Sequence, residues 1–253
     1  MTVILLPIVA TFGASGVLVV GLMAGVILVG LAYAGAGRTM RYVPVPVIEG
    51  FTVGIAVIIA LGQLPSALGV AATGETVLAL DASALAAWAA APTLVAPAIT
   101  LAVAGAILLG VRFRPGVPVS LAAVAVATLV VAVAGLPAPT IGEIAAGLRA
   151  PSLPGVELRA LGALVLPAVA VAALAALESL LSATVADGMS VGERHDSDRE
   201  LFGQGVANLV APLFGGMPAT AAIARTAVNV RSGARSRLAA ITQSVALLVV
   251  VLV

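Results

Sequence analysis

The chain has 253 residues, of which 62% are hydrophobic and only 9% are Asp, Glu, Lys or Arg, with a net charge of +1. A soluble globular domain carries about 25% charged residues, so this composition excludes a soluble fold and indicates an integral membrane protein. Because there is no cysteine and almost no net charge, neither a disulfide framework, a thiolate metal site nor binding to nucleic acid is expected.

Long runs without charged residues predict the membrane segments. A spanning helix needs about 20 mostly apolar residues, and a membrane barrel would instead alternate polar and apolar residues. The predicted fold class is therefore an all-α integral membrane protein. Its spanning helices are predicted near 14–36, 46–64, 84–110, 117–136 and 160–187, with partial segments at 1–10 and 238–253.

The arginines indicate how the chain is oriented. If the loop after the first spanning helix is cytoplasmic, only Arg149 and Arg159 fall outside and Arg225 lies within the membrane. This asymmetry follows the positive-inside rule and predicts a multi-pass protein of the plasma (cytoplasmic) membrane. The nine arginines on the inside are Arg38, Arg41, Arg112, Arg114, Arg194, Arg199, Arg231, Arg235 and Arg237.

A charged stretch separates two of the apolar runs. Six of the eight residues from 193 to 200 are Asp, Glu or Arg, and the single histidine, His195, lies among them. This composition is typical of a solvated cytoplasmic loop. Ser197 or Asp198 is predicted to be the N-cap of the helix that follows.

Glu178 is an acidic residue well inside an otherwise apolar run. A charge near the bilayer centre costs about 2.5–3.5 kcal/mol, so such residues usually face a cavity or an ion pathway. Ser182, four residues later, lies on the same helix face. This pair suits Na⁺ or a proton relay, and no cofactor beyond such a coupling ion is expected. The alternative is a protonated Glu178 that serves packing.

Residues 200–231 form two short apolar segments separated by Gly215-Gly216-Met217-Pro218. The first has 14 residues, about 21 Å of helix, which is short of the ~30 Å membrane core. Such interrupted segments indicate discontinuous helices at a transporter binding site. The alternative is a kinked hairpin in which Arg225 reaches the interface.

The second short segment predicts an anion site. Its helix is expected to start just after Pro218 with Thr220 as its cap, and its free amides carry a partial positive charge to which Arg225 adds a guanidinium. The candidate substrate-binding residues are Thr220, Ala221, Ala222, Ile223, Ala224 and Arg225.

Three stretches resemble the SulP (sulfate permease) family of anion transporters. They are residues 215–235, residues 178–182 together with 186–189, and residues 37–46 together with 50–52. They occur in the family's order along nearly the whole chain, and the run from 215 to 235 is highly specific.

The resemblance implies fourteen membrane segments in two inverted repeats of seven, with a core domain that moves against a gate domain and usually a cytoplasmic STAS domain. Core elements are expected at about 1–44 and 160–253, and gate elements at about 45–136, in one partial transporter domain. The first two segments, the start of the third, the last three and the STAS domain are absent from this sequence. With no basic leader and an apolar C-terminal run, no secretory signal is expected and both ends are expected to be truncated.

The resemblance also implies where the substrate binds. In the family it lies between the starts of two half-helices, the third and tenth segments. Residues 219–225 resemble the start of the tenth, and residues 1–10 resemble the body of the third. Glu178 falls on the eighth segment, where family members often carry an acidic residue near the substrate or coupling ion.

The function implied is secondary active transport of a small inorganic anion of the sulfate or bicarbonate/chloride class, coupled to H⁺ or Na⁺, by alternating access. Ala222 and Ala224 stand where many relatives carry serine, so the resemblance does not decide which anion is transported. The alternatives are a nucleobase/xanthine or dicarboxylate carrier of the same fold, an uncoupled anion channel, or a passive structural subunit. An enzyme is not expected, because the predicted spans contain no paired acids, Ser/His pair or metal cluster. The expected partners are the anion, the lipid bilayer and a second copy in a homodimer.

Overall fold

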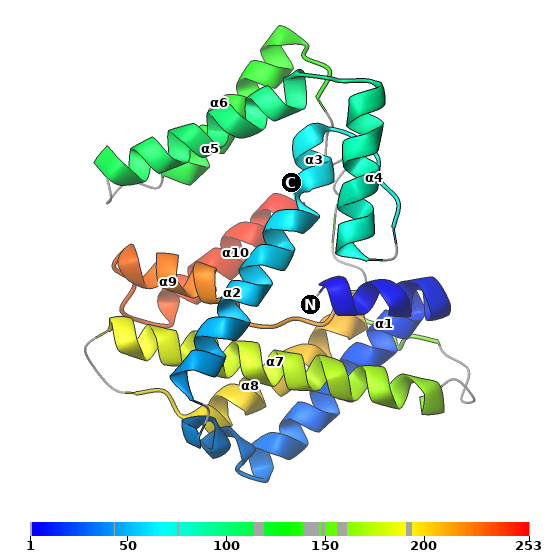
Figure 1. Ribbon diagram of the computed structural model, residues 1–253. Helices are drawn as coiled ribbons and strands as arrows, with labels where there is room; N and C mark the ends of the chain where they lie inside the picture. Colours follow the sequence, from blue (N-terminus) through cyan, green and yellow to red (C-terminus); the bar gives the residue numbers. More distant parts are fainter. Residues whose placement is uncertain are drawn as a thin grey trace. The chain divides into compact units, whose positions relative to one another are not determined.

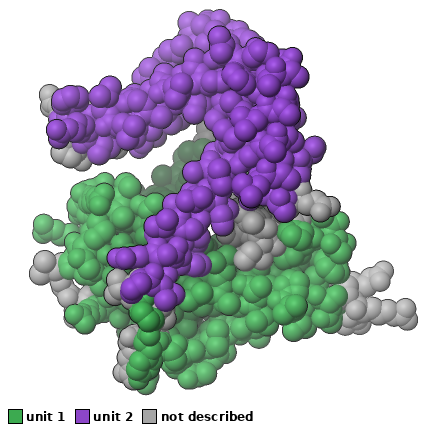
Figure 2. All heavy atoms as spheres, viewed as in Figure 1, with its two compact units in different colours: residues 1–44, 145–253 green, residues 45–144 purple. Residues whose placement is uncertain are grey.

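Two compact units make up the computed structural model, and they are coloured separately in Figure 2. One contains Met1–Pro44 and Ala145–Val253, and the other contains Val45–Ile144. Their assignment to a core and a gate domain stays a prediction. The structure describes residues 2–42, 44–74, 76–113, 119–138, 147, 150–155, 161–190 and 194–252. Arg114, Arg149, Arg159 and Glu193 lie outside these residues.

The described residues form helices and loops without a strand, as the apolar runs predict. The helices of the first unit are α1 (Thr2–Tyr33), η1 (Ala36–Tyr42), α7 (Leu161–Met189), α8 (Ser197–Val210), η3 (Ala211–Phe214), α9 (Ile223–Arg231) and α10 (Leu238–Leu252) (Figure 1). Among the described residues, four helices are long and apolar enough to cross a membrane. Their spanning parts are Pro7–Tyr33, Glu49–Leu68, Val95–Phe113 and Leu161–Met189.

The core of the first unit lies where α1, α7 and α8 pack together, and α7 also packs against α9. Lipid chains are as apolar as leucine, so close packing rather than exclusion of water holds helices together in a bilayer. Glycines allow this close packing where α1 contacts α8. A Cβ atom added to Gly25 would lie only 2.9 Å from the carbonyl oxygen of Gly205, so a larger residue would not fit there. The fully buried large aliphatic side chains of this core are Val20, Leu28, Leu164, Val171 and Leu201.

Helix α1 is interrupted at Gly13, which has φ of +67° and ψ of −172°. These angles are outside the helical region and favour glycine, because a Cβ disfavours positive φ. The chain therefore changes direction between a short N-terminal helix and the spanning part of α1. This break separates the partial segment predicted at 1–10 from the span predicted at 14–36.

The second unit contains α2 (Val45–Gly62), α3 (Leu64–Leu68), α4 (Val77–Ala90), α5 (Val95–Phe113) and α6 (Val119–Ala134). The single span predicted at 84–110 is wrong, because α4 ends and α5 begins inside it. Pro92 lies in the break, where it can donate no amide hydrogen bond and disfavours a helical residue before it. The Trp88 indole N–H donates to the Thr93 carbonyl at 2.9 Å across this break.

Candidate anion site at the start of α9

The interruption predicted between the two short segments is present. Helix α8 continues into η3, and Gly215 then ends the helical path with φ of +79°. Its amide donates to the Pro212 carbonyl at 3.0 Å, and the Gly216 amide donates to the Ala211 carbonyl at 2.8 Å. Residues 215–222 run without helix to the start of α9 (Figure 1).

The start of α9 differs from the prediction. The helix begins at Ile223, and its N-cap residue Ala222 makes no side-chain hydrogen bond. Thr220 is therefore not the cap, and that prediction is wrong. Its hydroxyl donates instead to the Ala175 carbonyl of α7 at 3.4 Å, so it ties the segment before α9 to α7.

Asn208 explains why the chain stays extended before α9. Its side chain is fully buried, and it pairs with both backbone groups of Ala219. The amide nitrogen Nδ2 donates to the Ala219 carbonyl at 2.8 Å, and Oδ1 accepts from the Ala219 amide at 2.9 Å. Nδ2 also donates to the Gln204 carbonyl at 2.9 Å. The side chain thus takes the place of a neighbouring strand and holds Ala219 in a non-helical conformation.

A second contact joins α9 to α7. The hydroxyls of Ser182 and Thr226 share a hydrogen bond of 2.6 Å, and Ser182 is only 2% exposed. Its hydroxyl, expected to face a coupling ion, is thus engaged with α9. Glu178 lies one turn earlier on α7 and is half-buried. The fully buried Ser179 hydroxyl next to it has no hydrogen-bond partner among the described residues.

The first turn of α9 has free donors. The first backbone bond of the helix runs from the Thr226 amide to the Ala222 carbonyl at 2.9 Å. The amides of Ile223, Ala224 and Arg225 therefore have no acceptor within the helix and carry its partial positive charge. The Arg225 side chain is exposed and forms no ion pair with the described residues. The sequence from 201 to 253 has four arginines and no Asp or Glu, so no acid within this segment neutralises the turn.

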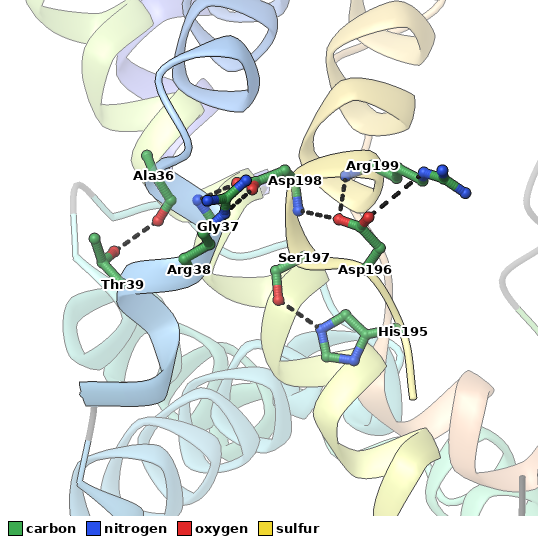
Figure 3. Close-up of polar contacts among 9 residues, drawn as sticks. All are labelled: Ala36, Gly37, Arg38, Thr39, His195, Asp196, Ser197, Asp198 and Arg199. Carbon is green, nitrogen blue, oxygen red and sulfur yellow. Dashed lines mark hydrogen bonds and ion pairs between the residues drawn. The ribbon is translucent and has the colours of Figure 1, made fainter. Parts of the chain in front are cut away.

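The charged stretch after α7 forms an ordered polar network (Figure 3). Asp196, not Ser197 or Asp198, is the N-cap of α8, and its carboxylate accepts from the amides of Asp198 and Arg199 at 3.0 and 3.1 Å. The bond from the Arg199 amide stabilises the charged form and is the main reason that the pKa of Asp196 lies below its ordinary value. The predicted cap is wrong because Asp198 turns toward η1. There it accepts from the Gly37 amide at 3.0 Å and from Arg38 Nε at 2.9 Å.

His195 is held by side-chain contacts, so the prediction of a solvated stretch is wrong for this residue, whereas Arg194, Asp196 and Arg199 are exposed as predicted. The side chains of His195 and Asp187 are 22% and 20% exposed, and Nδ1 lies 2.7 Å from the Asp187 carboxylate. A carboxylate only accepts, so Nδ1 carries the proton, and Nε2 can accept from the Ser197 hydroxyl at 3.1 Å. This chain of hydrogen bonds joins the end of α7 to the start of α8.

Comparisons with known proteins decide the family. Residues 6–253 match the sulfate permease family. The chain belongs to this family. It is 41% identical to the putative sulfate transporter YvdB of Bacillus subtilis, over 99% of this chain and 48% of that protein. It is 31% identical to the bicarbonate transporter BicA of a Picosynechococcus species, over 100% of this chain and 47% of that protein. The chain thus spans about half the length of these curated relatives.

Solved structures confirm the predicted fold class. The transmembrane domain of a cyanobacterial bicarbonate transporter BicA superposes with a TM-score of 0.75 at 30% identity, covering 97% of this chain and 64% of that chain. The inward-facing murine anion transporter Slc26a9 gives a TM-score of 0.78 at 20% identity, over 95% of this chain and 41% of that chain, which shows the fold alone. These neighbours share the inverted-repeat fold. The chain is therefore an integral membrane protein of a transporter family and not of an enzyme family.

Proposed function

We propose that the protein transports a small inorganic anion of the sulfate or bicarbonate/chloride class across the plasma (cytoplasmic) membrane by alternating access. The observation that supports this most is the first turn of α9. Three unbonded amides and the exposed Arg225 lie together there, in a stretch of 53 residues without an acid. Helix starts of this kind bind anions, and the relatives described above are named for sulfate and bicarbonate.

The substrate would be held by backbone groups and one side chain. Of the candidate residues, Thr220 already bonds α7, and Ala221, Ala222 and Ala224 carry no hydroxyl. The donors left are the amides of residues 223–225 and the guanidinium of Arg225. This set recognises charge and size rather than a particular pattern of substrate hydroxyls or ring nitrogens, and so it favours an inorganic anion over a nucleobase.

Coupling is proposed to pass through α7. Glu178 and Ser182 are one turn apart on this helix, and the Ser182 hydroxyl bonds Thr226, the residue after Arg225. A cation or proton bound at Glu178 would offset the negative charges of the anion and of the Glu178 carboxylate. The anion and the coupling ion would then cross the membrane together as α7 and α9 move. We also propose that the complete protein works as a homodimer, with the units described above acting as core and gate.

Uptake into liposomes tests this function in the full-length protein that contains this chain. Radiolabelled sulfate, bicarbonate and chloride are offered separately, and one of them is expected to saturate and to be exchanged by the same anion trapped inside. Saturation with exchange is the behaviour of a carrier, whereas a channel gives neither. Faster uptake of uracil, xanthine or a dicarboxylate than of all three inorganic anions would contradict the proposal.

Glu178→Gln is expected to remove the dependence of uptake on the H⁺ or Na⁺ gradient, or to stop uptake, because glutamine keeps the shape and loses the charge. The measurement is initial anion uptake at several external pH values and Na⁺ concentrations. Glu49→Gln, which removes an exposed acid from the second unit, is the matched control and should keep the dependence of the parent. Unchanged uptake with unchanged ion dependence in Glu178→Gln would assign this residue to packing.

A further inference from the structure

A hollow of about 1080 Å³ lies at the opposite end of α9 from the candidate anion site. Its lining comes from the end of α7, the end of α9, the loop between α9 and α10, and the start of α10, which are all in the first unit. The polar lining includes Ser190, Arg235, Ser236 and Arg237. The hollow is therefore a second polar site, distinct from the one proposed for transport.

The two arginines bring positive charge to the hollow. Arg235 and Arg237 are exposed, and their side chains form neither a hydrogen bond nor an ion pair with another described residue. Glu200 is the last acidic residue before them in the sequence, and none follows. Two guanidinium groups and the hydroxyl of Ser236 form a set of donors, and phosphate, with its several acceptor oxygens, suits them.

An apolar groove continues from the hollow along α10. It has a volume of about 330 Å³, and Ile241 lines both the hollow and the groove. Its other lining residues, Ala240, Ser244, Val245 and Leu248, follow the helical spacing of one face. From Ile241 to Leu248 this face extends about 10 Å at 1.5 Å per residue. A soluble anion would use only the hollow, whereas a molecule with a charged head and an apolar chain would use both.

The position in the chain fits a lipid. The arginines lie directly before the apolar helix α10, where a polar loop meets the membrane. The distribution of arginines predicts that this loop is cytoplasmic. The cytoplasmic leaflet carries anionic lipids, and basic pockets between membrane helices on this side bind their headgroups. We propose that the hollow and the groove together bind an anionic phospholipid, with its phosphate at Arg235 and Arg237 and an acyl chain along Ile241 and Leu248.

Lipid binding to the full-length protein that contains this chain, in detergent micelles, tests the proposal by native mass spectrometry. The probes are dioctanoyl phosphatidylglycerol, dioctanoyl phosphatidylcholine with the same chains but no net charge, and inorganic phosphate. Phosphatidylglycerol is expected to bind about tenfold or more tightly than phosphatidylcholine, because each arginine near the membrane surface contributes about fivefold. Inorganic phosphate at the same concentration should not displace it.

Variants separate the two parts of the site. The double variant Arg235→Gln/Arg237→Gln should weaken phosphatidylglycerol binding about thirtyfold and leave phosphatidylcholine unchanged. Arg231→Gln, an exposed arginine of the same region that does not line the hollow, is the matched control and should stay within about twofold of the parent. Ile241→Asn should weaken both lipids, and circular dichroism checks that each variant keeps its helices.

Three results would overturn the proposal. Equal binding of the two lipids by the parent would show that charge is not recognised. Full phosphatidylglycerol binding by the double variant would place the lipid elsewhere. Displacement of the lipid by inorganic phosphate at equal concentration would make the hollow a site for a soluble anion.

Discussion

Asn208→Leu is expected to lower the free energy of unfolding by about 2–3 kcal/mol and to weaken anion binding at α9. Leucine has a similar volume but makes none of the three hydrogen bonds of Asn208. Such bonds in membrane proteins contribute about 0.6 kcal/mol each. The amide and carbonyl of Ala219 and the carbonyl of Gln204 would also lose these partners, which adds to the loss. Residues 215–222 would then be held less firmly, by Thr220 and Ala175, and the first turn of α9 would be less well positioned.

The measurement is unfolding by SDS in mixed micelles, followed by circular dichroism, together with an anion titration. Gln204→Leu is the matched control, because it makes the same polar-to-apolar change one turn earlier on α8. Its side chain makes only one long bond, of 3.4 Å to Glu200, and the variant should lose less than about 0.5 kcal/mol. Equal stability of Asn208→Leu and the parent would show that the Asn208–Ala219 pairing does not hold this segment.

The interruption before α9 could be predicted because its cause is local. Gly215 adopts a positive φ that glycine accepts, and Pro218 follows shortly after it, so the residue types alone mark the break. The partner of the extended segment could not be predicted in the same way. Asn208 and Ala219 are 11 residues apart, and only the turn between them brings the side chain to the backbone. The only sequence signal for this contact was an asparagine within an apolar segment, and it does not show which residue the asparagine bonds.

Two of the wrong predictions, the single span at 84–110 and the solvated stretch around His195, have different causes. The break between α4 and α5 was visible as Pro92, but the charge-free run around it was long enough to suggest one span. The ordering of His195 had no local signal, because its partner Asp187 is on α7 and composition alone indicates a solvated stretch. Composition thus predicted which stretches are apolar, whereas a proline break and side-chain contacts between helices determine where the helices end and how their ends are held.

Arg225→Ala is expected to weaken anion binding about ten- to a hundredfold in the full-length protein. A charge-assisted hydrogen bond contributes about 1.5–3 kcal/mol, and each 1.4 kcal/mol corresponds to a factor of ten. Arg225→Lys should recover part of the loss, since it keeps the charge without the fork of donors. The measurement is a binding titration with sulfate, bicarbonate and chloride. Arg231→Ala, at the far end of the same helix, is the matched control and should change affinity less than about twofold.

The affinity for the anion that the Arg225→Ala variant retains should come from the free amides at the start of α9. Ile223→Pro tests the contribution of these amides separately. Proline lacks the amide hydrogen but is tolerated in the first position of a helix. The residue before it, Ala222, already has φ of −112° and ψ of 115°, which is the extended conformation that a following proline favours. Ile223→Ala removes most of the same side chain and keeps the amide, so a loss of affinity confined to Ile223→Pro belongs to the backbone donor. If Arg225→Ala and Ile223→Pro both bind every anion as tightly as the parent, the anion does not bind at the start of α9, and Arg225 serves the structure.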